Sequence, residues 1–135
     1  MTIPEHAQYW FDTAANDWET VGALQAKNRR PALVITHWTL EKLSKALWVR
    51  ENQKTITPGE GTDDVAVLLT ETSFTLSPAQ TAFVTRLKAL HDHEVEYDPE
   101  RPVAPIQAPE TQETLIAQAN ELRRQLLEKL SHEAA

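Results

Sequence analysis

The chain has 135 residues, about the size of one domain, and its 13 Lys and Arg against 20 Asp and Glu give a formal net charge of −7. The absence of Cys excludes disulfides, thiolate catalysis and Cys-ligated metal sites, and the acidic balance argues against indiscriminate binding to phosphate backbones. No apolar run approaches the roughly 20 residues of a membrane span, and the N-terminal sequence lacks the features of a secretory signal. We therefore expect a cytoplasmic protein with no membrane partner.

Scarce glycine and apolar residues three and four apart predict an all-α fold, an up-and-down bundle of four to five helices. The first helix is expected from about Glu5 to Lys27, with one apolar stripe made by Trp10, Ala14, Trp18, Val21 and Leu24. A turn of three residues follows, and Pro31 suits the start of a second helix that ends near Asn52. Its buried stripe is expected to comprise Leu33, His37, Leu40, Leu43 or Ser44, and Leu47. Two long helices joined by so short a turn must be antiparallel.

An exposed loop is expected from Gln53 to Thr62, after which Asp63 or Thr62 caps a short helix that ends near Thr72. That helix should bury Val65, Leu68 and Leu69. Ser77 and Pro78 favour the start of a fourth helix, which ends near Tyr97 and buries Phe83, Leu87, Leu90 and Val95.

Four prolines between Asp98 and Pro109 predict a semi-extended connector. A last helix is expected over about Glu110 to Ser131, with a seam formed by Leu115, Ala119, Leu122, Leu126 and Leu130. We expect residues 1–101 to form the bundle, and residues 102–135 to be a Pro-rich connector and a C-terminal helix packed on the same domain.

Residues 29–54 contain six Lys and Arg but only two Asp and Glu, so a basic island lies within an acidic chain. One interpretation places Lys42 and Lys45 on a solvated face of the second helix, and the other makes the island a contact surface for an anion or RNA. His37, Glu41 and Lys45 are spaced four residues apart and share one helical edge. They either form a partly exposed ladder, or His37 and Lys45 hold a buried Glu41 that faces a ligand cleft with Asp17.

No metal site is expected. His91, His93 and Glu94 lie close in sequence, but residues two apart on a helix do not face each other, and the Glu-x-x-His pairs of di-iron bundles are missing. We expect no cofactor.

Four segments together resemble the HEPN domain, a small helical bundle: YWFDTAANDWETVGAL, PALVITHWTLEKLSKALWV, GTDDVAVLL and LKALHDHEVEYDPER. The resemblance covers about residues 8 to 101. The second segment carries most of it, because the family typically shows Glu-Lys followed by Leu-Lys-Ala-Leu where this chain has EKLSKAL.

Some HEPN domains are metal-independent ribonucleases, often toxins of toxin–antitoxin pairs, with a catalytic Arg followed after four to six residues by His. Arg86 and His91 match that spacing, so the resemblance implies a His that moves the 2′-hydroxyl proton and an Arg that stabilises the phosphorane charge. Two departures weaken the match: Leu87 stands where a polar residue is usual, and His93 where an aromatic one is usual.

The chain also resembles a second branch of the family, whose members are non-catalytic, nucleotide- or substrate-binding partners of separate nucleotidyltransferase chains. Tyr97 and Pro99 are similar to the end of the fourth helix in that branch, and Tyr97 would then contribute to ligand binding. A purely structural or protein-interaction bundle is the third alternative. The aromatic girdle of Trp10, Phe11, Trp38 and Trp48 also favours a homodimer.

Overall fold

The structure, a computed structural model, describes residues 2–27, 31–56, 61–95 and 110–133. These residues form five helices and no strand: α1 (Ile3–Ala26), α2 (Pro31–Asn52), α3 (Val65–Thr70), α4 (Pro78–Val95) and α5 (Gln112–Glu133). The all-α bundle is confirmed. The expected turn at 28–30, part of the loop at 57–60, Tyr97 and the connector at 98–109 lie outside the described residues.

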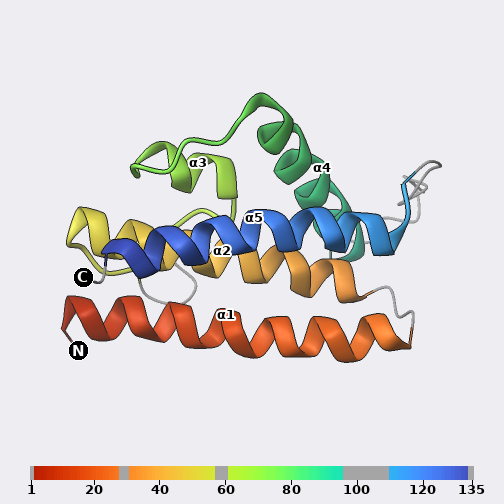
Figure 1. Cartoon of the computed structure of the whole chain (residues 1–135), viewed down its shortest axis with the longest axis horizontal. Coiled ribbons are helices and arrows are strands. Elements are labelled where there is room, and N and C mark those ends of the chain that lie inside the picture. The colour runs from red at the N-terminus through yellow and green to blue at the C-terminus, as the bar shows by residue number, and fades with distance from the viewer. Residues whose placement is uncertain (1, 28–30, 57–60, 96–109, 134–135) are drawn as a thin grey trace.

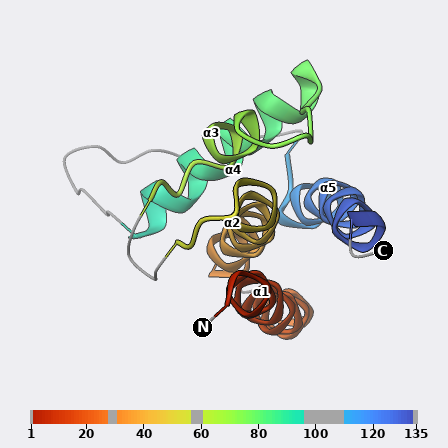
Figure 2. The same cartoon turned by 90° about the vertical axis from the view of Figure 1, so that its left-hand side faces the viewer.

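The five helices are arranged around α2. Figure 1 shows α1 and α2 running antiparallel, α5 running parallel to α2, and α4 inclined across them. In the end-on view α1, α5 and the α3–α4 pair surround α2 on three sides (Figure 2). Helix α2 packs against all four other helices. Each candidate site residue on α2 therefore lies close to another helix.

The helices begin where local chemistry favours them. Ser77 accepts a hydrogen bond from the Gln80 amide at 3.0 Å, and the Gln80 side chain accepts one from the Ser77 amide at 2.9 Å, which forms a capping box before Pro78. The prediction that Asp63 or Thr62 caps α3 was wrong, because the capping residue is Asp64. Asp64 caps this helix by accepting from the Val67 amide, whereas the Thr62 hydroxyl accepts from the Asp64 amide.

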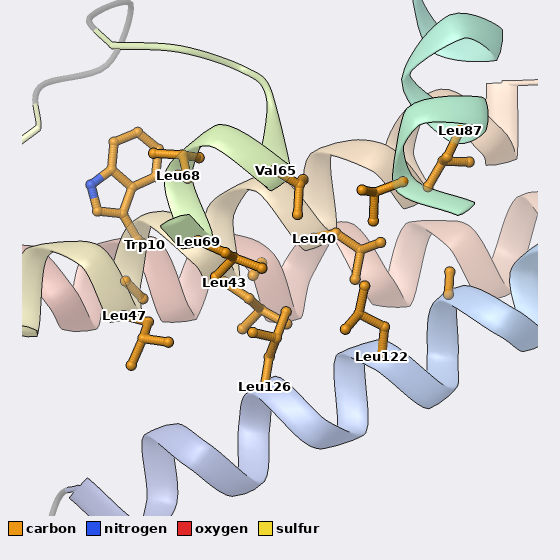
Figure 3. Close-up of a cluster of buried hydrophobic side chains, with 14 of the residues drawn as sticks. Trp10, Leu40, Leu43, Leu47, Val65, Leu68, Leu69, Leu87, Leu122 and Leu126 are labelled. Carbon is orange, nitrogen blue, oxygen red and sulfur yellow. The ribbon is translucent and has the colours of Figure 1, made fainter. Parts of the chain in front are cut away.

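Leucines from α2 to α5 fill the centre of the bundle (Figure 3). The predicted seam of α5 is confirmed, because each of its members is buried: Leu115, Ala119, Leu122, Leu126 and Leu130. The buried residues predicted for α3 are confirmed as well. The prediction for Val95 was wrong: it lies at the last position of α4 and is 50% exposed.

The exposure expected for Lys45 and for several aromatic residues also differs. Lys45 is 5% exposed instead of solvated, because α2 is covered around most of its circumference. Trp10 is buried, and Trp38 and Trp48 are partly buried, so the expected apolar girdle is packed largely inside one chain. Among the helices that the structure describes, none is both long and apolar enough to cross a membrane.

Candidate functional site

The residues singled out on the second helix meet two other elements in a mostly buried polar cluster, which we define as His37, Glu41, Lys45, Asp63 and His91. The first three lie one turn apart on α2, Asp63 precedes α3, and His91 lies near the end of α4. The ring centroids of His37 and His91 are 4.5 Å apart. Packing of α4 on α2 thus joins His91, half of the predicted ribonuclease pair, to the predicted ligand-binding edge of α2.

The ring of His91 is held on both sides. The Trp38 indole donates a hydrogen bond to His91 Nε2 at 2.9 Å, and His91 Nδ1 lies 2.9 Å from Asp92 Oδ1. Because an indole N–H only donates, Nε2 must carry the lone pair and Nδ1 the proton. Burial acts to raise the pKa of Asp92, but hydrogen bonds from Lys88 and His91 outweigh it and lower that pKa below its usual value. Asp92 is therefore an ionised acceptor that fixes the tautomer of His91.

His37 is more deeply buried and less satisfied. It is 1% exposed, and neither ring nitrogen makes a hydrogen bond of normal geometry among the described residues, although the backbone of Asp63 approaches the ring. Its Nε2 lies 3.8 Å from Glu41 Oε1, which is too long for a hydrogen bond. Burial, followed by the neighbouring His91, lowers the pKa of His37 to about 4. At neutral pH the ring is uncharged and its lone pair points into the protein interior.

Glu41 and Lys45 form a buried ion pair, with 3.3 Å between Lys45 Nζ and Glu41 Oε2. The ammonium group also lies 4.8 Å from the centroid of the Trp10 ring. Burial raises the pKa of Glu41, although Lys45 opposes the rise. Asp17, expected beside Glu41 in a cleft, instead pairs with Lys42 at 2.7 Å between α1 and α2. The partly exposed ladder is thus replaced by a buried pair.

Arg86 and His91 contact different parts of the bundle. Arg86 Nε lies 3.0 Å from Glu110 Oε2 and its Nη2 lies 2.8 Å from Glu110 Oε1, a bidentate pair just before α5. Hydrogen bonding to Glu110 raises the pKa of Arg86. His91 is 6% exposed and turned towards α2. Within one chain the structure does not bring the two side chains to a common site.

Two lysines of the basic island and one lysine of α4 are paired with carboxylates, whereas Lys54 of the island is exposed. Lys42 contacts Asp17, Lys45 contacts Glu41, and on α4 the Lys88 ammonium lies 2.7 Å from Asp92. These pairs leave the lysines facing carboxylates within the chain. An RNA or phosphate surface would need cations directed to solvent.

A separate apolar groove lies between the N-terminal half of α1, the end of α2 and the end of α5. Its volume is about 740 Å³, and Ile3, Phe11, Leu127 and Leu130 are among the residues that line it. None of the predicted site residues lines this groove.

Sequence reasoning missed the approach of Asp63 to the two histidines, because Asp63 was considered only as a helix cap. In the sequence, His37 itself indicated that such a partner exists. A histidine on a stripe predicted to be buried needs a polar partner, and that partner had to come from another element. A comparison of the chain with models of known protein families, with curated proteins and with solved structures finds no match. The resemblance to HEPN domains therefore rests on the sequence segments quoted above.

Proposed function

We propose that the chain is a HEPN-like module of the non-catalytic branch, which acts by binding a separate nucleotidyltransferase chain and does not cleave RNA. One observation carries this choice between the branches: Arg86 and His91 are engaged by different partners within the chain. The identity of the partner comes from the resemblance in sequence.

The surroundings of His91 support a structural role for it. A general base must reach the hydroxyl proton that it removes, at hydrogen-bond distance. The basic nitrogen of His91 already accepts the Trp38 N–H, and the ring is 6% exposed. A ribose hydroxyl would have to displace the indole to reach it.

The surroundings of Arg86 point the same way. Both carboxylate oxygens of Glu110 accept hydrogen bonds from its guanidinium group. An arginine that stabilises a phosphorane needs its donors directed at the reacting phosphate. Here the pair joins α4 to the start of α5 instead, so Arg86 contributes to the position of α5.

The experiment mixes the purified full chain with a nucleotidyltransferase chain from the same genome. That second chain is chosen by its catalytic motif, Gly-Ser followed by Asp-x-Asp. Size-exclusion chromatography with light scattering should show one complex of defined stoichiometry. Separate elution at micromolar concentrations would contradict the proposed partner and favour a structural bundle.

The homodimer and the cytoplasmic location stay predictions that belong to this proposal. Light scattering of the chain alone should give about twice its mass of 15.3 kDa. A mass of one chain at micromolar concentration would contradict the dimer.

A further inference from the structure

His37, Asp63 and His91 place three metal-ligating side chains together from three separate elements. One ligand atom from each lies within 4.8 Å of the other two. The two histidines are buried, whereas the side chain of Asp63 is 48% exposed. The cluster thus has a rigid inner part and one more accessible carboxylate.

We propose that His37, Asp63 and His91 bind a divalent first-row transition-metal ion of the Zn²⁺ class. This inference is independent of the proposed function, since it requires neither a partner chain nor a reaction. Two imidazoles and one carboxylate suit Zn²⁺, Co²⁺ or Ni²⁺, whereas Mg²⁺ and Ca²⁺ prefer sites made of oxygen ligands. Zinc sites with three protein ligands complete their coordination with water.

The unpartnered ring of His37 is the second observation that points to a ligand. Buried polar atoms in proteins are nearly always hydrogen-bonded, but neither nitrogen of this ring makes a hydrogen bond of normal geometry among the described residues, although the backbone of Asp63 approaches the ring. A metal ion bound to one nitrogen would satisfy it. The neutral form of the ring, which metal binding requires, is already the form present at pH 7.

The partners of His91 prepare it for the same role. A metal-ligating histidine usually donates its other N–H to a carboxylate, which orients the ring. His91 Nδ1 faces Asp92 in this way, so Nε2 is the nitrogen left for the metal. Trp38 now donates to Nε2 and would have to release it. Trp38 is only partly buried, so breaking this hydrogen bond does not require the unpacking of a fully buried side chain.

Asp63 supplies the movement that closes the site. Ligand atoms around a tetrahedral ion with bonds of about 2.1 Å lie roughly 3.4 Å apart, so the present separations, which reach up to 4.8 Å, must shrink by up to about 1.4 Å. Asp63 lies in the segment before α3 and is not its cap, which is Asp64. Its contact with Lys88 is loose at 3.7 Å, because Lys88 is closer to Asp92, at 2.7 Å.

The test is calorimetric titration of the EDTA-treated, desalted full chain with ZnCl₂, with MgCl₂ as a control ion. We expect one Zn²⁺ per chain and no binding of Mg²⁺. Asp63→Asn, which keeps the Asp64 cap and the fold, should weaken Zn²⁺ at least about 10-fold, and His37→Gln at least about 100-fold. His93→Gln, on the same helix but outside the cluster, should bind Zn²⁺ like the wild type.

A variant of Trp38 separates this site from adventitious binding to surface histidines. Trp38→Phe removes the N–H that competes for His91 Nε2, so it should bind Zn²⁺ as tightly as the wild type or more tightly. Bound Co²⁺ should give a visible absorption spectrum that disappears in His37→Gln. Absence of a one-to-one complex, or equal Zn²⁺ affinity in the wild type, Asp63→Asn and His37→Gln, would overturn the proposal.

Discussion

His37 of α2 and His91 of α4 lie against each other in the bundle, with ring centroids 4.5 Å apart and planes inclined by 39°. Burial and the nearby His91 ring both disfavour protonation of His37, because desolvation and repulsion act against charge on its imidazole. The contact therefore links the packing of two helices to the protonation of one side chain.

The first prediction is a loss of stability in acid caused by His37. Its pKa is lowered to about 4 in the folded chain, against an ordinary value of 6.5 for histidine. The unfolded chain thus binds more protons between these pH values, and the free energy of unfolding falls as the pH decreases from 6.5 to 4. The loss at pH 5 should be about 2 kcal/mol.

Urea denaturation at pH 7.5 and pH 5 in EDTA measures this effect as the difference between the wild type and His37→Leu. The comparison cancels the titration of other acids. The leucine variant should lose about 2 kcal/mol less than the wild type between the two pH values, and His93→Leu should behave like the wild type. Identical pH dependence in the wild type and His37→Leu would refute the role assigned to His37.

The second prediction concerns the buried pair of Glu41 and Lys45. Lys45→Met leaves the Glu41 carboxylate buried without its cation and should lower the free energy of unfolding by about 3 kcal/mol at pH 7.5. The deficit should shrink at pH 5, because the pKa of Glu41 is already raised and protonation removes the charge. Adding Glu41→Gln to Lys45→Met should recover much of the loss.

Lys42→Met is the matched control for that measurement. Its ammonium is more exposed and pairs with Asp17 between α1 and α2, so we expect a cost below about 1 kcal/mol. Chemical denaturation of the wild type, Lys45→Met, the double variant with Glu41→Gln, and Lys42→Met measures the free energies of unfolding. An equal loss in Lys42→Met and Lys45→Met would contradict the role given to the buried pair.

The third prediction tests whether α5 belongs to the same cooperative unit as the rest of the bundle. Leu126 is fully buried against the centre, and Leu126→Ala should cost about 2 to 5 kcal/mol. Arg124→Ala, an exposed change on the same helix, should stay within about 0.5 kcal/mol. Thermal unfolding followed by circular dichroism should show one transition, shifted downwards by Leu126→Ala. Loss of α5 signal in a separate early transition would place that helix outside the unit.

The fourth prediction concerns the start of α3. Asp64→Ala removes the side chain that caps the Val67 amide and should cost about 1 kcal/mol. Asp63→Ala leaves the cap in place and, in EDTA, should cost less than half of that. A larger loss for Asp63→Ala than for Asp64→Ala, measured by urea denaturation, would show that the wrong residue has been assigned as the cap.

The sequence predicted most of the helix positions, because their signals are local. Pro31 and the pair Ser77 and Pro78 mark helix starts through their own backbone geometry, and the leucine seam of α5 follows from its periodicity. The bounds expected for the second helix agree with α2.

The site was harder to predict, because it depends on which elements pack together. Because α2 packs against all four other helices, some of its polar positions are covered as well, so periodicity could not show that Lys45 is buried. The pairing of Arg86 with Glu110, and of His91 with Trp38, joins segments far apart in sequence. A motif defined by spacing within one helix carries no information about such partners.

The choice between binding and catalysis depends on whether Arg86 and His91 stabilise the fold or cleave RNA. Because both side chains have partners within the chain, Arg86→Ala and His91→Ala should each lower the melting temperature, the buried His91 by more. His93→Ala, partly exposed on the same helix, should have little effect.

Incubation of the wild type with single-stranded RNAs of varied sequence in EDTA, followed by gel electrophoresis, shows whether Arg86 and His91 form a ribonuclease site. We predict that the RNA stays intact, as it does with Arg86→Ala and His91→Ala. Cleavage by the wild type that falls by about 10²- to 10⁴-fold in His91→Ala, with the variant still folded, would contradict the account and identify the chain as a ribonuclease.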